Sequence, residues 1–237
     1  NGRAFHPRID LNKTYSFQNL DLVQQAKLQE LYIDYFYRRQ EDFWRAQAMQ
    51  KLPALKASTD MLICGEDLGM VPACVPGVMR ELGILTLEIQ RMSKNPATEF
   101  LQEEDIPYLS VASPSTHDMA PIRAWWEEED RALISRFLLN ELKFMGQEPY
   151  TCEPFLAKAV VEKHLRWPSM WTVFPLQDLL AMDLKLRREN PAEERINVPA
   201  IMPYYWRYRM HLNLEDLIEA EGFNLMLHDL LHRYDRA

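Results

Sequence analysis

Short apolar runs that alternate with helix-like segments place the strongest limit on how this chain of 237 residues can fold. Four such runs, at 61–65, 84–89, 108–112 and 171–174, have the length of a β-strand and are too short for a helix. Strands that alternate with helices are typical of βαβ units, in which consecutive strands run parallel. We therefore predict a helix-rich α/β fold around a parallel sheet of four strands, which amounts to half of a larger sheet.

The helix-like segments carry apolar residues at every third or fourth position. The longest begins after Asp21, a residue type that favours helix N-termini, and continues to about Met49. We expect Pro53 to end it, because proline interrupts helix hydrogen bonding. Shorter helices are predicted at 75–82, 120–129, 130–144, 155–165 and 176–182, and a closing helix at 214–234.

Composition limits the partners of the chain. Hydrophobic residues make up 47% of it and charged residues 26%, which excludes a disordered tail or a fibrous protein. The net charge of −8 indicates no basic surface for nucleic acid or anionic lipid. No apolar run approaches the roughly 18 residues that a membrane span needs. We therefore expect a small or neutral partner, with no nucleic acid and no membrane.

The cellular compartment is inferred from the cysteines. Cys64, Cys74 and Cys152 are odd in number and too sparse for a disulfide framework, which favours a reducing cytoplasm. The first residues, 1–4, show neither an initiator methionine nor a signal-peptide profile. We expect a processed chain or a fragment of a longer one.

The motif Gly-Glu-Asp-Leu-Gly at 65–69 directly follows the first predicted strand. Glu66 and Asp67 would therefore lie at the carboxyl end of a parallel strand, the end that carries the active site in α/β barrels. The alternative is a helix N-terminus, with Asp67 as its cap and Glu66 favoured by the helix dipole. The spacing alone leaves both interpretations open.

A second motif, Ser-Pro-Ser-Thr-His-Asp at 113–118, follows the third predicted strand and brings His117 and Asp118 to a strand end. Asp118 could instead cap the next helix, with Pro121 in its first turn, and both roles are compatible. Carboxyl groups from two different strand ends are what glycoside chemistry requires, since one acts as an acid and another attacks or stabilises the sugar.

Other chemistry-bearing patterns favour ordinary structural roles. His228 and His232 have the spacing of a helical zinc site, but Asp229 stands where a metalloprotease has Glu, so we predict an exposed helix face and no metal. The sequence contains no glycine-rich nucleotide motif. Trp125 and Trp126 could stack on a sugar ring, although one of two adjacent helical tryptophans normally faces the core.

Three motifs in order carry a resemblance to a known family: Gly-Glu-Asp-Leu-Gly at 65–69, Ser-Thr-His-Asp-Met-Ala-Pro-Ile-Arg-Ala-Trp-Trp at 115–126, and Glu-Arg-Ile-Asn-Val-Pro-Ala at 194–200. From about Tyr32 to Asp216 the chain resembles the 4-α-glucanotransferases, also called amylomaltases or disproportionating enzymes, and most closely their long-chain branch. The resemblance implies a (β/α)8 TIM barrel with helical insertions and retaining transfer of α-1,4-linked glucosyl units without a cofactor. Residues 1–237 would supply barrel strands five to eight, with 1–20 as the end of an insertion.

The resemblance also implies roles for individual residues. Glu66 matches the general acid/base, and Asp118 matches the carboxylate that stabilises the distorted sugar in the transition state. His117 would contact the same sugar, and Asn197 would line the substrate cleft. Arg91 lies in the segment that makes acceptor-side contacts, where the shorter family members have apolar residues.

The nucleophile that retaining chemistry needs is the main departure from the family pattern. It should lie about 5 to 5.5 Å from the acid/base, and the family supplies it in an Arg-Ile-Asp-His stretch at the end of the fourth strand. Asp10 follows Arg8 and Ile9, but no apolar strand precedes it and Leu11 stands in place of His. We therefore assign Asp10 to the insertion and expect a nucleophile outside residues 1–237, which makes the chain alone inactive.

The expected partners follow from the same resemblance. They are a maltodextrin or other α-1,4-glucan, the missing amino-terminal half of the same protein and, through exposed barrel edges, a second copy of the chain. Two alternatives stay open: hydrolysis of the same bond, and a non-catalytic glucan-binding or assembly module.

Overall fold

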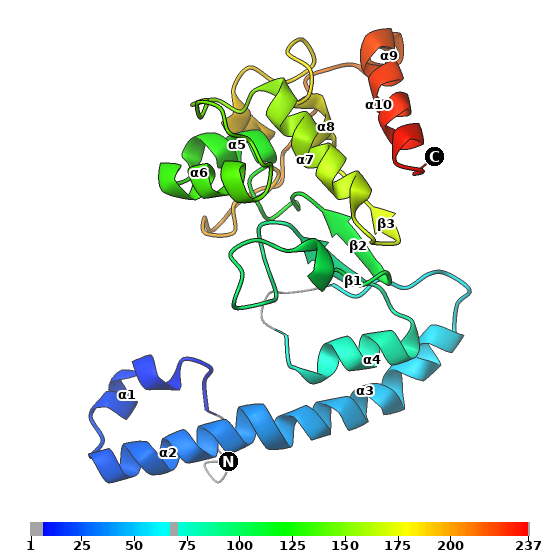
Figure 1. Cartoon of the computed structure of the whole chain (residues 1–237). Coiled ribbons are helices and arrows are strands. Elements are labelled where there is room, and N and C mark those ends of the chain that lie inside the picture. The colour runs from blue at the N-terminus through cyan, green and yellow to red at the C-terminus, as the bar shows by residue number, and fades with distance from the viewer. Residues whose placement is uncertain (1–6, 67–70, 237) are drawn as a thin grey trace. The chain divides into compact units, whose positions relative to one another are not determined.

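A computed structural model of the chain describes residues 7–66 and 71–236 (Figure 1). The chain divides into two compact units, one of residues 1–63 with 70–84, and one of residues 64–69 with 85–237. We describe each unit by itself. No helix of the described residues is long and apolar enough to cross a membrane.

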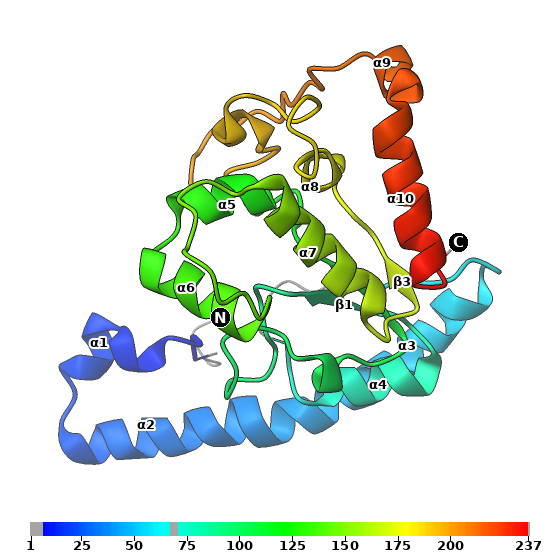
Figure 2. The same ribbon diagram turned by 45° about the horizontal axis from the view of Figure 1, so that its top comes forward.

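The first unit is dominated by a long helical segment, drawn in blue in Figures 1 and 2. It consists of α2 (Leu22–Asp34), a π-helical turn (Tyr35–Arg39) and α3 (Gln40–Ala57). The carboxylate of Asp21 accepts a hydrogen bond of 2.8 Å from the Gln24 N–H, which confirms the predicted helix start. Two short elements precede α2: the 3-10 helix η1 (Leu11–Lys13) and α1 (Tyr15–Gln18).

The prediction that Pro53 ends this helix is wrong, because Pro53 lies inside α3. A proline at this position removes the N–H that would bond the Met49 carbonyl. Packing compensates for this loss, since α3 contacts α4 (Cys74–Leu82) and the Lys56 ammonium donates to the carbonyl of Leu82. The core of this unit is formed by Val78, Leu82 and Ile84 with Ala48, Met49, Leu52, Ile63 and Met79 packed against them.

The second unit contains a parallel sheet of β1 (Thr86–Ile89), β2 (Ser110–Ser113) and β3 (Trp171–Thr172), in that order. Three of the four predicted strands are thereby confirmed, as is their parallel direction. In the register, Thr86 pairs with Ser110, Ile89 with Ser113, Val111 with Trp171 and Ala112 with Thr172. Because β2 is central, both of its edges are hydrogen-bonded, and the chain that leaves its carboxyl end starts from a fixed position.

The first predicted strand, at 61–65, is not formed as a strand. Cys64 makes one isolated parallel bridge with Leu85, and the Gly65 N–H donates to the Leu85 carbonyl at 2.8 Å. Met61 is 75% exposed and Leu62 is 50% exposed. A strand of a parallel sheet is normally covered on both faces, and these side chains lack that cover.

The helices of the second unit follow the predicted segments, with shifted ends. They are α5 (Ile122–Glu128), α6 (Arg131–Asn140), α7 (Pro154–Arg166), α8 (Leu176–Leu180), α9 (Leu214–Glu219) and α10 (Glu221–Arg233), with 3-10 turns at Glu103–Asp105 and Pro191–Glu194. The predicted closing helix is divided in two, because Ala220 leaves the helical conformation at ψ 60°.

The main core of the second unit lies among α5, α6, α7, α8 and α10. Figure 1 shows α5, α7 and α8 on the same side of the three strands. Trp126 is fully buried there and donates to the Pro149 carbonyl at 3.1 Å, whereas Trp125 is only partly buried. The expectation that one of these tryptophans faces the core is confirmed. A smaller cluster contains Leu101, Ile106, Ala112 and Trp167.

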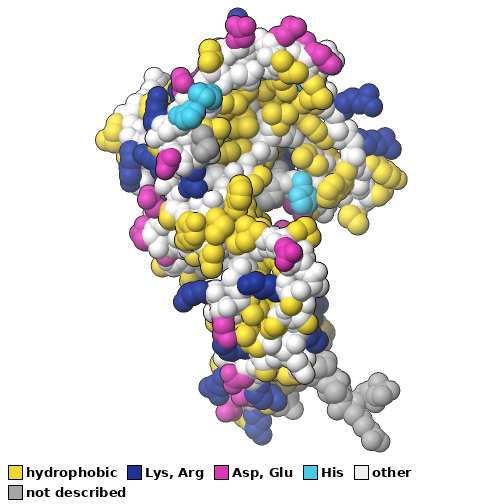
Figure 3. Space-filling model, turned by 90° about the vertical axis from the view of Figure 1, so that its right-hand side faces the viewer, with side chains coloured by type: hydrophobic (Ala, Val, Ile, Leu, Met, Phe, Trp, Pro, Cys, Tyr) yellow, Lys and Arg dark blue, Asp and Glu magenta, His cyan; other side chains and the backbone are white. Residues whose placement is uncertain are grey.

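Large hydrophobic side chains also stay exposed on this unit. Trp171 in β3 and Val173 just after it are exposed, as are Leu225 and Leu231 on α10. Figure 3 shows broad hydrophobic patches in the upper part of one face of the molecule. Among the described residues, β3 pairs only with β2, so its outer edge keeps backbone groups that another strand could bond.

His164 on α7 makes stability depend on pH. It is fully buried, its Nδ1 lies 2.7 Å from the Val160 carbonyl oxygen, and burial lowers its pKa from 6.5 to about 4. Because the folded state holds the ring neutral, the stability it contributes is present above pH 6.5 and is lost as the pH falls through about 4. We expect the free energy of unfolding to drop by up to about 3 kcal/mol over this interval.

Urea unfolding at pH 7 and pH 4.5 measures this effect. The His164→Gln variant should lose less stability between the two pH values than the wild type. The His211→Gln variant, which changes an exposed histidine, should keep the wild-type dependence. An equal pH dependence in wild type and His164→Gln would contradict the assignment.

Candidate functional site

The loop that follows β2, residues 114–121, carries the two most exposed polar side chains of its motif. His117 and Asp118 lie in a turn of this loop, with Nε2 of His117 3.4 Å from Oδ2 of Asp118. About half of each side chain is exposed. The alternative role of Asp118 as a helix cap is contradicted, because α5 begins after Pro121 and the carboxylate caps no helix there.

Asn197 joins this pair although it lies 79 residues further along the chain. Its Nδ2 donates to Oδ1 of Asp118 at 2.6 Å, and its backbone N–H donates to the His117 carbonyl at 3.1 Å. The structure therefore brings together three residues that the sequence analysis singled out in two separate motifs. We call His117, Asp118 and Asn197 the polar triad.

Trp206 extends the polar triad with an aromatic surface that the sequence analysis did not single out. Its ring centroid lies 4.9 Å from that of His117, and the side chain is 60% exposed. An exposed tryptophan beside polar groups presents an apolar face and a hydrogen-bonding edge to the same ligand. The aromatic run Tyr204, Tyr205, Trp206 soon after the Asn-Val-Pro stretch was the signal that could have identified it.

Arg91, which follows β1, supports the same loop. Its Nε and Nη2 donate to the Pro114 carbonyl at 3.2 and 3.1 Å, and Nη2 donates to the Ala120 carbonyl at 2.7 Å. The guanidinium lies 4.9 Å from the ring centroid of Trp125. Burial lowers the pKa of Arg91 to about 10, so it stays cationic at neutral pH. With these donors engaged by carbonyls, the geometry favours a role in holding the 114–121 loop over the predicted acceptor contact.

The segment that carries Asn197 is anchored by a buried ion pair. Nη1 of Arg123 on α5 donates to Oε1 of Glu194 at 2.7 Å, and both side chains are almost completely buried. Burial raises the pKa of Glu194 to about 7, against the effect of Arg123. Since Glu194 precedes Asn197 by three residues, this pair helps fix where the Asn197 amide meets Asp118.

Glu66 is exposed just after the bridge between Cys64 and Leu85. Because that bridge is parallel, the chain leaves it in the same direction as β1 and β2. Among the described residues, no hydrogen bond or ion pair holds the Glu66 carboxylate. Asp67 and Gly69 of the same motif lie outside the described residues, and so does the cap role considered for Asp67.

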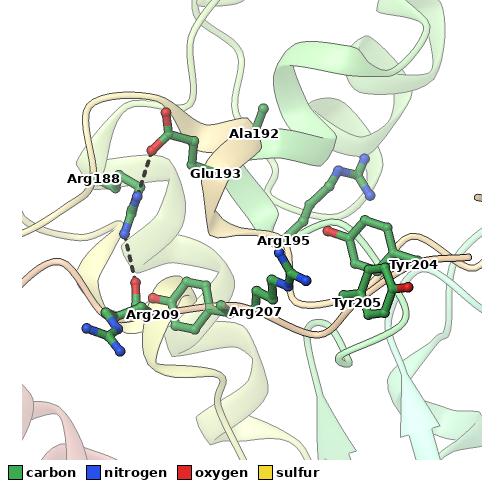
Figure 4. Close-up of a pocket in the computed structure, with 9 residues that line it drawn as sticks. Arg188, Ala192, Glu193, Arg195, Tyr204, Tyr205, Arg207 and Arg209 are labelled. Atoms are coloured by element: carbon green, nitrogen blue, oxygen red, sulfur yellow. Dashed lines mark hydrogen bonds and ion pairs between the residues drawn. The ribbon is translucent and has the colours of Figure 1, made fainter.

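A pocket of about 320 Å³ lies on the same segment as Asn197 and Trp206. Nη1 of Arg188 contacts Glu193 at 2.6 Å and its Nη2 donates to the Arg209 carbonyl at 2.8 Å. Figure 4 shows the guanidinium of Arg207 close to the ring of Tyr205, and their separation is 4.8 Å. The pocket is lined by Arg188, Ala192, Glu193, Arg195, Tyr204, Tyr205, Arg207, Tyr208 and Arg209. Such a mixture of planar polar groups and aromatic rings suits a hydroxyl-rich ligand.

Two other groups considered in the sequence take part in none of these contacts. Asp10 precedes the 3-10 helix η1, pairs with Lys13 at 3.1 Å and belongs to no strand. His228 and His232 are exposed neighbours on α10, with their Nε2 atoms 2.9 Å apart. Among the described residues, no cluster of three or more metal-ligating side chains occurs.

Comparison with known proteins adds the following findings. A family model described as 4-alpha-glucanotransferase matches residues 10–214. The rice protein 4-alpha-glucanotransferase DPE2 is 43% identical over 98% of this chain and 24% of its own length. A 4-alpha-glucanotransferase of Chlamydia trachomatis is 30% identical over 78% of this chain and 35% of its own length. The chain thus spans about a quarter to a third of these relatives.

Solved structures share the fold. The amylomaltase from Streptococcus agalactiae, solved in complex with acarbose, matches 80% of this chain with a TM-score of 0.61 and 21% identity. The match covers 35% of that protein. The amylomaltase from Corynebacterium glutamicum matches 68% of the chain with a TM-score of 0.51 and 17% identity.

Proposed function

The chain belongs to the 4-alpha-glucanotransferase family, and from this premise we propose that it is part of an enzyme that transfers α-1,4-linked glucosyl or maltodextrin units between glucan chains. The observation that carries the proposal is the polar triad. Asn197 donates to one oxygen of Asp118 and leaves the other beside His117. A half-exposed carboxylate held in this way can face the positive charge that develops on a sugar during transfer.

The proposed reaction is a double displacement. The Glu66 carboxylic acid protonates the glycosidic oxygen as the bond from that oxygen to C1 of the donor sugar breaks, and a nucleophilic carboxylate forms a bond to the same C1. The Glu66 carboxylate then removes a proton from the acceptor hydroxyl, whose oxygen displaces the nucleophile from C1. Asp118 stabilises the charge in both steps, His117 and Asn197 contact the sugar, and Trp206 offers a stacking surface. No metal or organic cofactor takes part in this scheme.

We also propose that the described sheet is part of a (β/α)8 barrel. The run at 61–65 and strands β1 to β3 would be strands five to eight, and residues 1–20 would end an insertion. The parallel order of β1, β2 and β3 supports this, as does the parallel bridge from Cys64 to Leu85. The open edge of β3 and the exposed Trp171 and Val173 support pairing with the amino-terminal half of the protein or, without it, with a second copy.

The proposed compartment is the cytoplasm. Cys64, Cys74 and Cys152 are all free thiols, which is the state that a reducing compartment maintains. The proposed glucan needs no basic surface, in keeping with a net charge of −8. Neither nucleic acid nor a membrane is part of the proposal.

Incubation with maltotriose tests the proposed function. We expect the full-length polypeptide that contains residues 1–237 to release glucose and form longer maltodextrins. Residues 1–237 alone should form neither, because Asp10 has no strand to place it as a nucleophile. Product formation by residues 1–237 that the Asp10→Ala change abolishes would overturn the assignment of the nucleophile to another part of the protein.

The same assay separates the two alternatives. Glucose and maltose without longer products would indicate hydrolysis, in which water takes the place of the acceptor hydroxyl. Binding of maltodextrin by the full-length polypeptide with no product would indicate a glucan-binding module. Either result would contradict transfer as the main activity.

A further inference from the structure

A buried carboxylate holds the loop that carries His117 and Asp118. Asp178, in the first turn of α8, is completely buried. Its Oδ1 accepts a hydrogen bond of 2.7 Å from the Ile122 N–H, and its Oδ2 accepts one from the Ser115 hydroxyl. Ser115 lies near the start of the 114–121 loop and Ile122 directly follows its end. One side chain from α8 thus fixes both ends of the loop.

Arg91 complements this contact with the opposite charge. Its guanidinium donates to the carbonyls of Pro114 and Ala120, again one near each end of the loop. The carboxylate of Asp178 therefore takes the loop's donors and the guanidinium of Arg91 takes its acceptors. The turn between these two ends, which carries His117 and Asp118, is held by Asn197 instead, through its backbone N–H and its side-chain amide.

The electrostatic environment of the Asp178 carboxylate makes it depend on these hydrogen bonds. Burial raises the pKa of Asp178, while the hydrogen bonds from Ser115 and Ile122 and the charge of Arg91 oppose that rise. A buried N–H that loses its acceptor is destabilising, because it has also lost its hydrogen bond to water. Loss of the Asp178 carboxylate would leave the Ile122 N–H and the Ser115 hydroxyl without this acceptor, so the two ends of the loop would move to find others.

We propose that Asp178 is a positioning residue, which acts through the 114–121 loop to set where the Asp118 carboxylate meets the sugar. The inference rests on the proposed function, in which Asp118 stabilises the transition state. It assigns to α8 a part in catalysis although Asp178 is buried and touches no substrate. A displacement of about 1 Å at a reacting group can lower a rate about 100-fold.

Steady-state kinetics on the full-length polypeptide test this role. Asp178→Ala should lower kcat about 100-fold and change KM by less than about threefold, since the loss is confined to the transition state. Asp178→Asn should recover kcat to within about fivefold of wild type, because its amide oxygen still accepts from Ile122. As a control, Asp183→Ala removes a carboxylate that accepts from the Lys185 N–H at 2.7 Å and should leave kcat unchanged.

A second background shows whether Asp178 acts through Asp118. In the Asp118→Asn variant, Asp178→Ala should lower kcat by less than about threefold. If Asp178→Ala does not fold, Ser115→Ala replaces it, because this change removes only one of the two hydrogen bonds. Ser115→Ala should lower kcat about tenfold in the wild-type background and should not change kcat in the Asp118→Asn background. Equal losses in both backgrounds would overturn the positioning role. Wild-type kcat in Asp118→Asn itself would instead overturn the proposed function.

Discussion

Glu66→Gln in the full-length polypeptide should lower kcat/KM for transfer from maltotriose by about 10⁴-fold. The amide keeps the shape of the side chain but can neither protonate the glycosidic oxygen nor take a proton from the acceptor. Glu66 is exposed and, among the described residues, unpaired, so its replacement breaks no contact of the fold. Maltodextrin affinity should therefore stay within about threefold of wild type, as measured by calorimetry.

Glu104→Gln is the matched control, because Glu104 is an exposed glutamate of a 3-10 turn. It should leave both transfer and binding unchanged. Transfer by Glu66→Gln at more than a tenth of the wild-type rate would exclude Glu66 as the acid/base. The mechanism would then require another proton donor.

Asp118→Asn should lower kcat about 1,000-fold with little change in KM. The substitution preserves the volume and keeps an oxygen for the bond from Asn197 but removes the negative charge, which matters most when positive charge develops on the sugar. The Asp118 side chain is about half exposed, so the fold should tolerate the change. Initial rates of glucose release from maltotriose measure the loss.

Asp105→Asn provides a control with the same local chemistry. Asp105 is exposed and accepts a hydrogen bond of 3.0 Å from the amide of Asn95, much as Asp118 does from Asn197. It should leave kcat unchanged. A drop in maltodextrin affinity for Asp118→Asn with kcat preserved would show that Asp118 binds glucan without stabilising the transition state.

The periodicity of the sequence was sufficient to predict local elements but not their limits. Apolar spacing identified the segments of α4 and α7, and Asp21 marked the start of α2, because these signals depend on neighbours within one or two turns. The end of α3 depends on packing against α4, which lies beyond Pro53 in the chain. The run at 61–65 has the composition of a strand, yet its formation depends on cover for Met61 and Leu62.

The candidate site, too, could be predicted only in part from the sequence. The sequence by itself determined that His117 and Asp118 follow a strand and that Asn197 lies in a separate motif, since residue type and strand ends are local properties. Only the tertiary structure decided that the Asn197 amide meets Asp118 across 79 residues, and that Trp206 packs on His117. The tertiary structure also showed that Asp178 bonds the 114–121 loop, because the donors to a buried carboxylate come from segments that are distant in the sequence.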